Sequence, residues 1–242
     1  MVVKMSENLI NILVSGSTGK MGQSLRDTLS QKKSKDDSVF RILEIVPLNF
    51  IENKEIWSSS IIIDFSDPSF SIATLEQAVI KKIPMVIGTT GFDEEQEKTI
   101  KEAAKKIPLI LAPNTSLGIT LLKEMLSSIK NHLVSHKIEI IEKHQKDKKD
   151  LPSGTSKDIA KYIENSLLDR KILIESLRED NSAGEHSVSL IKDNEVLTIS
   201  HKVTNRSVYS EGALLAAVWL DKKRGSSGLY QMSDIYVPFE ED

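Results

Sequence analysis

The sequence contains no cysteine, and this absence removes several classes of chemistry. Disulfide bonds, zinc sites built on thiolates and cysteine nucleophiles are all excluded. Charge of one sign is also scarce, because the formal net charge at pH 7 is only −3. The chain therefore has no overall positive field that would attract nucleic acid, and we predict no nucleic-acid partner.

Long hydrophobic runs are missing as well. The densest one, Ala213 to Leu220, is far too short to cross a bilayer. Residues 1–10 include Lys4 and Glu7 and lack the apolar core of a signal peptide. We therefore expect a cytoplasmic protein without membrane contact. Hydrophobic residues make up 39% of the 242 positions, which is enough for one large domain or two small ones with true cores.

Histidines are few, and their spacing does not favour a metal site. His132 and His136 are four residues apart on an expected helix, but no HExxH pattern accompanies them. We interpret them as a pair on a helix surface and predict no bound metal.

Apolar runs alternate with helical patterns over the first 115 residues. Strands are expected at 11–15, 40–46, 61–64, 85–87 and 109–111, and the intervening helices include 69–80 and 94–106. This alternation predicts a doubly wound parallel sheet of the Rossmann type. A polar turn follows most of the strands, at the edge of the sheet where open α/β folds bind their ligands.

The pattern changes after about Ser116. Helices are expected at 117–128, 156–168 and 211–221, with strands at 137–142, 186–191 and 196–203. The last two strands meet at Asp193-Asn194 and form a hairpin with one polar and one apolar face. The second half is therefore predicted to be α+β, with a mostly antiparallel or mixed sheet.

The first polar turn, Gly16 to Gly22, reads Gly-Ser-Thr-Gly-Lys-Met-Gly and separates a buried strand from an amphipathic helix. Glycines in such a turn permit a sharp bend, a close approach of backbone N–H groups to a pyrophosphate, and tight helix–strand packing. The N-terminus of the helix favours the anionic phosphates. This turn predicts a dinucleotide cofactor.

A second polar stretch, Glu142 to Thr155, combines a histidine, several lysines and the tail Pro-Ser-Gly-Thr before a helix. His144 is of the type that exchanges protons near neutral pH, and Lys148 can act as an acid or pair with an anion. Thr155 and Asp158 have the spacing of a capping box, and free N–H groups at the helix start could hold a carboxylate. The stretch suits a small molecule that carries carboxylates.

With both motifs, the chain resembles the dihydrodipicolinate reductases (4-hydroxy-tetrahydrodipicolinate reductases). Their pattern E-x-H-H-x-x-K-x-D-x-P-S-G-T matches Glu142 to Thr155 with one departure, and their G-x-x-G-x-M-G matches Gly16 to Gly22. Shorter matches follow in the family's order: 64–66, 88–92, 114–118, 184–186, 201–202, 206, 212–213, 219–220 and 228–229. The resemblance covers nearly the whole chain.

The resemblance implies an activity and an architecture. The activity is the reduction of 4-hydroxy-tetrahydrodipicolinate, a cyclic imine with two carboxylates, by hydride from NADH or NADPH, in the diaminopimelate pathway of lysine biosynthesis. The architecture is a dinucleotide-binding Rossmann domain of residues 1–115 and 207–242, and a substrate-binding and tetramerisation domain of residues 116–206. The assembly implied is a homotetramer.

The resemblance also implies roles for individual residues. His144 matches the catalytic histidine and Lys148 the proton donor, while Gln145, Gly154 and Thr155 match residues that contact the substrate. The matches to cofactor-binding residues are Gly16, Ser17, Thr18, Gly19, Lys20, Met21, Gly88, Thr89, Thr90, Ala112, Pro113, Asn114 and Thr115. Gln145 is a departure, because the family has a second histidine there, and an amide cannot become cationic.

The roles of several residues, and the function itself, have more than one interpretation. Glu44 falls inside the expected second strand, so no acid is assigned to the ribose, and the choice between NADH and NADPH is undecided. His186 and His201 are interpreted as structural, and Arg206 either binds a carboxylate or forms a salt bridge at the domain junction. The run from Lys143 to Lys149 is expected to order over bound substrate. The alternatives to the reductase are another amino-acid pathway dehydrogenase and a non-catalytic dinucleotide sensor.

Overall fold

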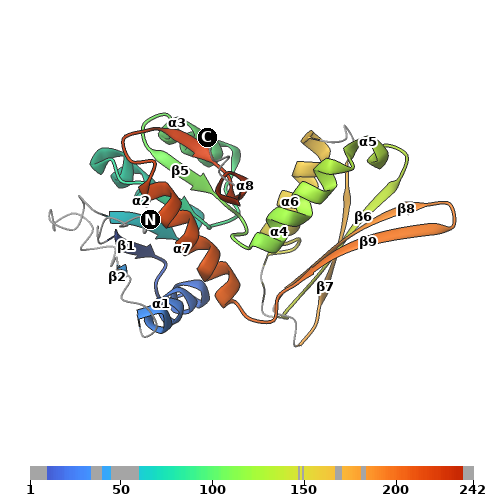
Figure 1. The fold of residues 1–242 in the computed structure, drawn as a ribbon, viewed down its shortest axis with the longest axis horizontal. Helices are drawn as coiled ribbons and strands as arrows, with labels where there is room; N and C mark the ends of the chain where they lie inside the picture. Colours follow the sequence, from blue (N-terminus) through green and yellow to red (C-terminus); the bar gives the residue numbers. More distant parts are fainter. Residues whose placement is uncertain are drawn as a thin grey trace, which may run out of the picture. The chain divides into compact units, whose positions relative to one another are not determined.

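The computed structural model describes residues 10–33, 40–44, 60–146, 148, 150–166, 171–180 and 184–236. The chain divides into two compact units, one of residues 1–115 and 209–242 and the other of residues 116–208. Figure 1 labels the helices and strands of both. Among the described residues, no helix combines the length and apolar character needed to span a membrane.

The first unit is built on a parallel sheet whose strand order is β10-β5-β4-β3-β1-β2. The strands are β1 (Ile10–Ser15), β2 (Phe40–Glu44), β3 (Ser60–Asp64), β4 (Met85–Ile87), β5 (Pro108–Leu111) and β10 (Gly228–Tyr230). Every paired strand runs parallel to its neighbour, which confirms the predicted sheet. Residues 45–59, which include the end of the expected second strand, lie outside the described residues.

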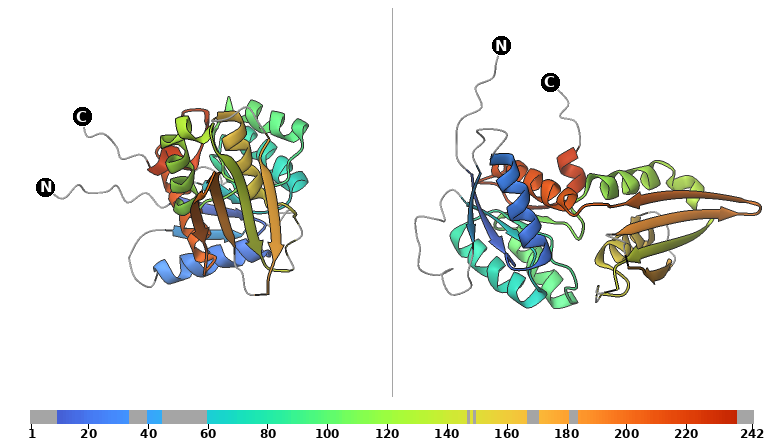
Figure 2. Two further views of the ribbon diagram at one scale, coloured as in Figure 1. Left: turned by 90° about the vertical axis from the view of Figure 1, so that its right-hand side faces the viewer. Right: turned by 90° about the horizontal axis from the view of Figure 1, so that it is seen from below.

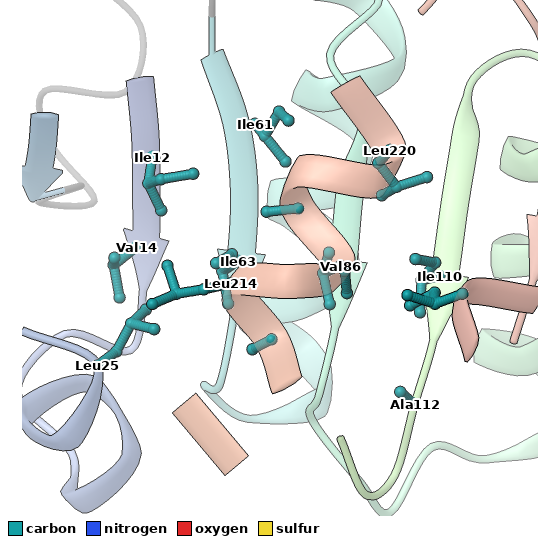
Figure 3. Close-up of a cluster of buried hydrophobic side chains, with 14 of the residues drawn as sticks. Ile12, Val14, Leu25, Ile61, Ile63, Val86, Ile110, Ala112, Leu214 and Leu220 are labelled. Atoms are coloured by element: carbon teal, nitrogen blue, oxygen red, sulfur yellow. The ribbon is translucent and has the colours of Figure 1, made fainter. Parts of the chain in front are cut away.

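Alternating side chains along the strands give this sheet two apolar faces. Ile12, Val14 and Ile61 face a cluster formed with α1 (Lys20–Lys33), α7 (Ser207–Asp221) and α8 (Met232–Tyr236), which Figure 3 shows in part. Leu13 and Ile62 face the opposite cluster, which contains α2 (Pro68–Lys81) and α3 (Glu94–Ala104). Helices on both faces are the defining feature of a doubly wound fold, as the alternation of elements predicts.

The second unit contains a four-stranded sheet with the order β7-β6-β8-β9. Its strands are β6 (Lys137–His144), β7 (Leu173–Arg178), β8 (Glu185–Lys192) and β9 (Glu195–Lys202). β8 pairs antiparallel with β6 and β9, whereas β7 runs parallel to β6, so the sheet is mixed. The expected hairpin turn at Asp193-Asn194 is confirmed by the pairing of Lys192 with Glu195.

Two helices, α4 (Leu117–Ser128) and α6 (Gly154–Ser166), cover one face of this mixed sheet, and α5 (Lys130–Leu133) adds a short turn. Figure 2 shows the strands with these helices on one side. The core between them includes Leu122, Ile140, Ile163 and Val188. On the opposite face no helix lies among the described residues of this unit, and there Leu173 and Val196 are 67% and 60% exposed.

Candidate active site

The glycine turn between β1 and α1 has the tight geometry that its sequence predicts. Gly16 has a positive φ of 76°, and a Cβ there would overlap the carbonyl group of Phe65. A Cβ on Gly22 would overlap the backbone of Gly16 and Ser17. The turn is closed by a hydrogen bond from the Gly19 N–H to the Gly16 oxygen at 3.1 Å. Only glycine fits at 16 and 22, which is what a backbone cradle for a pyrophosphate at a helix N-terminus requires.

The rest of the turn is partly or fully exposed to solvent. Thr18, Gly19 and Lys20 are exposed, whereas Ser17 and Met21 are half-buried. The Arg26 guanidinium of α1 donates to the Ser17 oxygen at 2.7 Å and braces the turn from behind. The predicted phosphate-binding residues therefore form one accessible segment at the carboxyl end of β1.

A buried carboxylate ties the neighbouring strand ends together. Asp64, at the end of β3, is fully buried and accepts from the hydroxyls of Ser66 at 2.5 Å and Thr89 at 2.7 Å. Thr89 also accepts from the Ser66 N–H at 2.9 Å. The ring of Phe65 packs where a Cβ on Gly88 would lie. The sequence places Asp64 in a polar turn at the ligand-binding edge of the sheet but predicts no individual role for it, and its buried hydrogen bonds to two neighbouring loops appear only in the structure.

The end of β5 supplies the last predicted cofactor residues. The Ala112 N–H donates to Ile87 at 2.9 Å, which places Ala112 beside Gly88 at the carboxyl ends of adjacent strands. Thr115 is buried, and its hydroxyl donates to the Tyr209 oxygen at 2.7 Å. The Thr115 side chain is thus committed to packing against α7, whereas Thr90, Pro113 and Asn114 are half-buried.

In the second unit, the predicted chemistry centres on β6. Alternation along β6 points Glu142 and His144 toward the buried face of the sheet. The fully buried Glu142 carboxylate accepts from the Ser153 N–H at 3.0 and 3.1 Å and from the Ser156 hydroxyl at 2.5 Å. Burial alone would raise the pKa of Glu142, but the hydrogen bonds from Ser153 and Ser156 lower it to about 2. Glu142 is therefore a permanent anion near neutral pH.

Three histidines form a row across β6, β8 and β9. The ring centroids of His144 and His186 lie 5.0 Å apart in a T-shaped arrangement, and those of His186 and His201 lie 6.3 Å apart. Burial lowers the pKa of His144 to about 4 and that of His186 to about 3. The expectation that His144 exchanges protons near neutral pH is wrong for this structure, because burial keeps the imidazole neutral.

The loop after β6 brings the remaining predicted residues together around a carboxylate. The ammonium of Lys148 lies 2.8 Å from Asp150 Oδ1, and the Gly154 N–H donates to Asp150 Oδ2 at 3.1 Å. Gln145 accepts from the Arg206 guanidinium at 2.9 Å, so Arg206 makes a contact within this unit that neither reading of it anticipated. Thr155 is buried in the first turn of α6. Lys148 and the N-terminus of α6 thus hold the carboxylate of Asp150.

The predicted capping box of Thr155 and Asp158 is wrong. α6 begins at Gly154, and its cap is Ser153, whose hydroxyl accepts from the Ser156 N–H at 3.2 Å. Asp158 instead pairs with Lys123 of α4 at 2.5 Å. The helix therefore starts two residues before the expected Ser156, because the Ser153 hydroxyl supplies the cap.

Within the described part of the chain, one group of residues has the composition of a metal site. Glu142, His144 and His186 each offer a ligand atom, and these atoms lie within 4.8 Å of one another. Both oxygens of Glu142 are already hydrogen-bonded, however, Oε1 by the Ser153 N–H and Oε2 by the Ser156 hydroxyl, and the Arg178 guanidinium stands 3.5 Å from Oε1. A cation would have to displace these donors and tolerate a positive neighbour, so the geometry favours a hydrogen-bonded anion.

Comparison with known proteins gives consistent matches along the chain. Family models described as dihydrodipicolinate reductase, N-terminus and C-terminus, match residues 10–115 and 118–236. The 4-hydroxy-tetrahydrodipicolinate reductase of Buchnera aphidicola subsp. Cinara cedri is 34% identical over 95% of this chain and 97% of its own. That of Rickettsia rickettsii is 33% identical over 94% of this chain and 99% of its own.

The fold is also shared with a solved structure. The dipicolinate-bound dihydrodipicolinate reductase from Paenisporosarcina sp. TG-14 superposes with a TM-score of 0.67 at 20% identity. The match covers 92% of this chain and 97% of that one. At this identity the likeness shows the fold alone.

Proposed function

The chain belongs to the dihydrodipicolinate reductase family, and we propose that it reduces 4-hydroxy-tetrahydrodipicolinate to tetrahydrodipicolinate with NADH or NADPH. This is a step of the diaminopimelate pathway of lysine biosynthesis. One observation of the structure carries the proposal beyond family membership. Lys148 and the Gly154 N–H already hold a carboxylate, that of Asp150, in the segment expected to bind a dicarboxylate.

The cofactor fits the first unit because of its glycine turn. Gly16 to Met21 would hold the pyrophosphate, since the tight turn depends on glycine at 16 and 22, where an added Cβ would overlap backbone atoms. Gly88 to Thr90 and Ala112 to Thr115, at the ends of β4 and β5, would flank the nicotinamide. When bound, the reduced nicotinamide supplies a hydride. The first unit thus serves as the dinucleotide-binding domain and the second as the substrate domain.

The reaction consumes one proton, because the substrate's 4-hydroxyl leaves as water while the ring receives a hydride. The ammonium of Lys148 supplies this proton to the leaving oxygen, as a general acid. His144 is neutral in this environment, so it orients the substrate's ring through a hydrogen bond rather than through charge. The N–H of Gly154, the hydroxyl of Thr155 and the amide of Gln145 bind the substrate's polar groups. Substrate displaces Asp150 from Gly154 when the loop orders over it.

A turnover assay tests this function. We expect the absorbance of the reduced cofactor to fall when the protein is mixed with freshly prepared 4-hydroxy-tetrahydrodipicolinate and either NADH or NADPH. Parallel runs at matched concentrations give the preferred cofactor. Turnover only with another substrate from a panel of amino-acid pathway intermediates would establish the alternative dehydrogenase. Cofactor binding without turnover of any substrate would establish the dinucleotide sensor.

We further propose a homotetramer in the cytoplasm. The helix-free face of the second unit's sheet supports the assembly, because it exposes Leu173, Leu177 and Val196 beside the half-buried Ile141 and Ile191. Apolar side chains on an uncovered sheet face favour association with another sheet. Light scattering should give four times the mass of the chain, and a monomer at assay concentrations would refute the assembly. Fractionation of the source cells tests the location.

A further inference from the structure

The hydrogen bonds around Glu142 run in a single direction. The carboxylate can only accept, so the Ser156 hydroxyl must donate its proton to Glu142 Oε2. The oxygen of Ser156 is then free only to accept, and it receives the hydroxyl proton of Ser153 at 3.2 Å. Each serine thereby has its one proton committed toward Glu142.

This direction determines which nitrogen of His186 carries the proton. The Ser153 oxygen lies 3.4 Å from His186 Nε2, and it has no proton left to donate to that nitrogen. This arrangement favours the tautomer of His186 that is protonated at Nε2 and unprotonated at Nδ1. Consistent with this tautomer, Nδ1 is buried without a hydrogen-bond partner among the described residues, so no buried N–H group is left unsatisfied.

The chain of hydrogen bonds reaches the residues that the proposed function uses. At one end, Glu142 and Ser153 fix the first turn of α6, which presents Gly154 and Thr155. At the other end, the ring of His186 packs against His144 at 5.0 Å. Pairing of β6 with β8 places Glu142 directly opposite His186. This buried chain of hydrogen bonds thus contacts both the first turn of α6 and His144.

We propose that Glu142 and His186 are positioning residues. Their hydrogen-bond chain, in which every proton is donated toward Glu142 through Ser153 and Ser156, holds two features in place for substrate: the first turn of α6, which presents Gly154 and Thr155, and the ring of His144. The proposal rests on the proposed function for its substrate, but the direction of the chain is a property of the folded protein alone. The replacement Glu142→Gln tests it, because it keeps the volume of the side chain and reverses that direction.

The reversal follows from the donors around Glu142. The Ser153 N–H lies 3.0 and 3.1 Å from the two oxygens and does not distinguish them. The Arg178 guanidinium, which cannot accept, stands 3.5 Å from Oε1, whereas the Ser156 hydroxyl, which can accept, lies at Oε2, so the new amide group is favoured at the Oε2 position. At that position the amide N–H donates to the Ser156 oxygen. The Ser156 hydroxyl then donates to the Ser153 oxygen, and the Ser153 hydroxyl donates to His186 Nε2. His186 then carries its proton on Nδ1.

Solid-state NMR of protein labelled with 15N-histidine reads the tautomer directly, and His186→Gln assigns the signal. We expect a neutral Nε2–H form of His186 in the parent protein and a neutral Nδ1–H form in Glu142→Gln. Ser156→Ala, which interrupts the chain, should give a mixture of both forms. Asp158→Asn is the matched control, because it also converts a carboxylate to an amide near α6 but leaves the chain intact. An Nδ1–H form in the parent, or one tautomer in all these variants, would overturn the proposal.

Kinetics supply the second readout. We expect Glu142→Gln to raise the KM for substrate about tenfold and to leave the KM for the cofactor unchanged. His186→Gln can place an N–H where Nε2 lies, so it should stay within about twofold of the parent, whereas His186→Leu should match Glu142→Gln. Equal effects of both His186 variants would show a packing role only. Loss of activity with a chelator and its recovery with Zn²⁺ would instead establish a metal site.

If the parent protein shows no turnover, the proposed function fails, but the tautomer result stands independently. If turnover is found and the tautomer does not respond to Glu142→Gln, the positioning proposal fails alone.

Discussion

Among the described residues, each unit has one fully buried carboxylate at or near the end of a strand, yet the surroundings of the two differ. Asp64 ends β3 and accepts from the hydroxyls of Ser66 and Thr89. Glu142 lies near the end of β6, beside His144 and within 3.5 Å of the Arg178 guanidinium. The first carboxylate joins loops that only need a fixed shape. The second also orders ionisable groups, which is what acid–base chemistry requires.

The largest expected effect is a loss of kcat without a loss of cofactor affinity, which would assign catalysis to the second unit and cofactor binding to the first. Lys148→Met removes the proposed proton donor, so kcat should fall about 100-fold or more, while the Kd for NADH should not change. Stopped-flow turnover and fluorescence titration measure the two quantities. Lys146→Met is the control, because Lys146 belongs to the same loop but pairs with the exposed Asp180. A kcat within twofold of the parent in Lys148→Met would exclude this assignment.

The next effect concerns the shape of the cofactor turn. Gly16→Ala adds a Cβ at a positive φ and against the Phe65 carbonyl, so cofactor affinity should fall more than about tenfold, with about 1–3 kcal/mol lost from the free energy of unfolding. Gly225→Ala provides the comparison, because Gly225 also has a positive φ of 82° but, apart from its chain neighbours, no described residue lies within 4 Å of its added Cβ. Isothermal titration measures the cofactor affinity and urea unfolding measures the free energy of unfolding. The loss that Gly225→Ala shows is due to the positive φ alone, and any additional loss in Gly16→Ala is due to the overlap with Phe65. Equal loss of cofactor affinity in both variants would contradict the overlap argument.

Lowering the pH should reduce the stability of the protein through the buried groups around Glu142. The Glu142 pKa is lowered from 4.5 to about 2, so its contribution to stability is present above pH 4.5 and is lost as the pH falls toward 2. The pKa values of His144 and His186 are lowered from 6.5 to about 4 and 3, so the unfolded chain binds more protons than the folded one below pH 6.5. Stability should therefore fall steadily from pH 6.5 downward.

Urea unfolding at several pH values measures this loss. His186→Gln should flatten the decline between pH 6.5 and 3, and Glu142→Gln should flatten it between pH 4.5 and 2. A decline that both variants leave unchanged would mean that other groups cause it.

The sequence predicted the fold of the first unit well because its strands are short apolar runs bounded by turns. β7 was missed because it is an edge strand whose side chains are all at least partly exposed, which weakens its periodicity. β10 has only three residues and becomes a strand through its pairing with β5. Tertiary pairing, rather than local pattern, creates both.

The candidate site was predictable where its residues are adjacent in sequence and not where the fold joins distant ones. Lys148, Gly154 and Thr155 belong to one recognisable stretch. His186 was interpreted as structural because nothing in the sequence shows that β8 places it opposite Glu142. The low pKa of His144 likewise results from burial, which the polar sequence around it conceals.

The most direct test of the account compares the two carboxylates in one experiment. Asp64→Asn and Glu142→Gln each convert a buried carboxylate to an amide, and the Kd for NADH and the affinity for dipicolinate, a non-reacting dicarboxylate probe, are measured calorimetrically for both. We expect Asp64→Asn to weaken NADH binding about tenfold without changing dipicolinate binding, and Glu142→Gln to do the reverse. If either variant weakened both ligands equally, the two carboxylates would not serve separate sites, and the account would be contradicted.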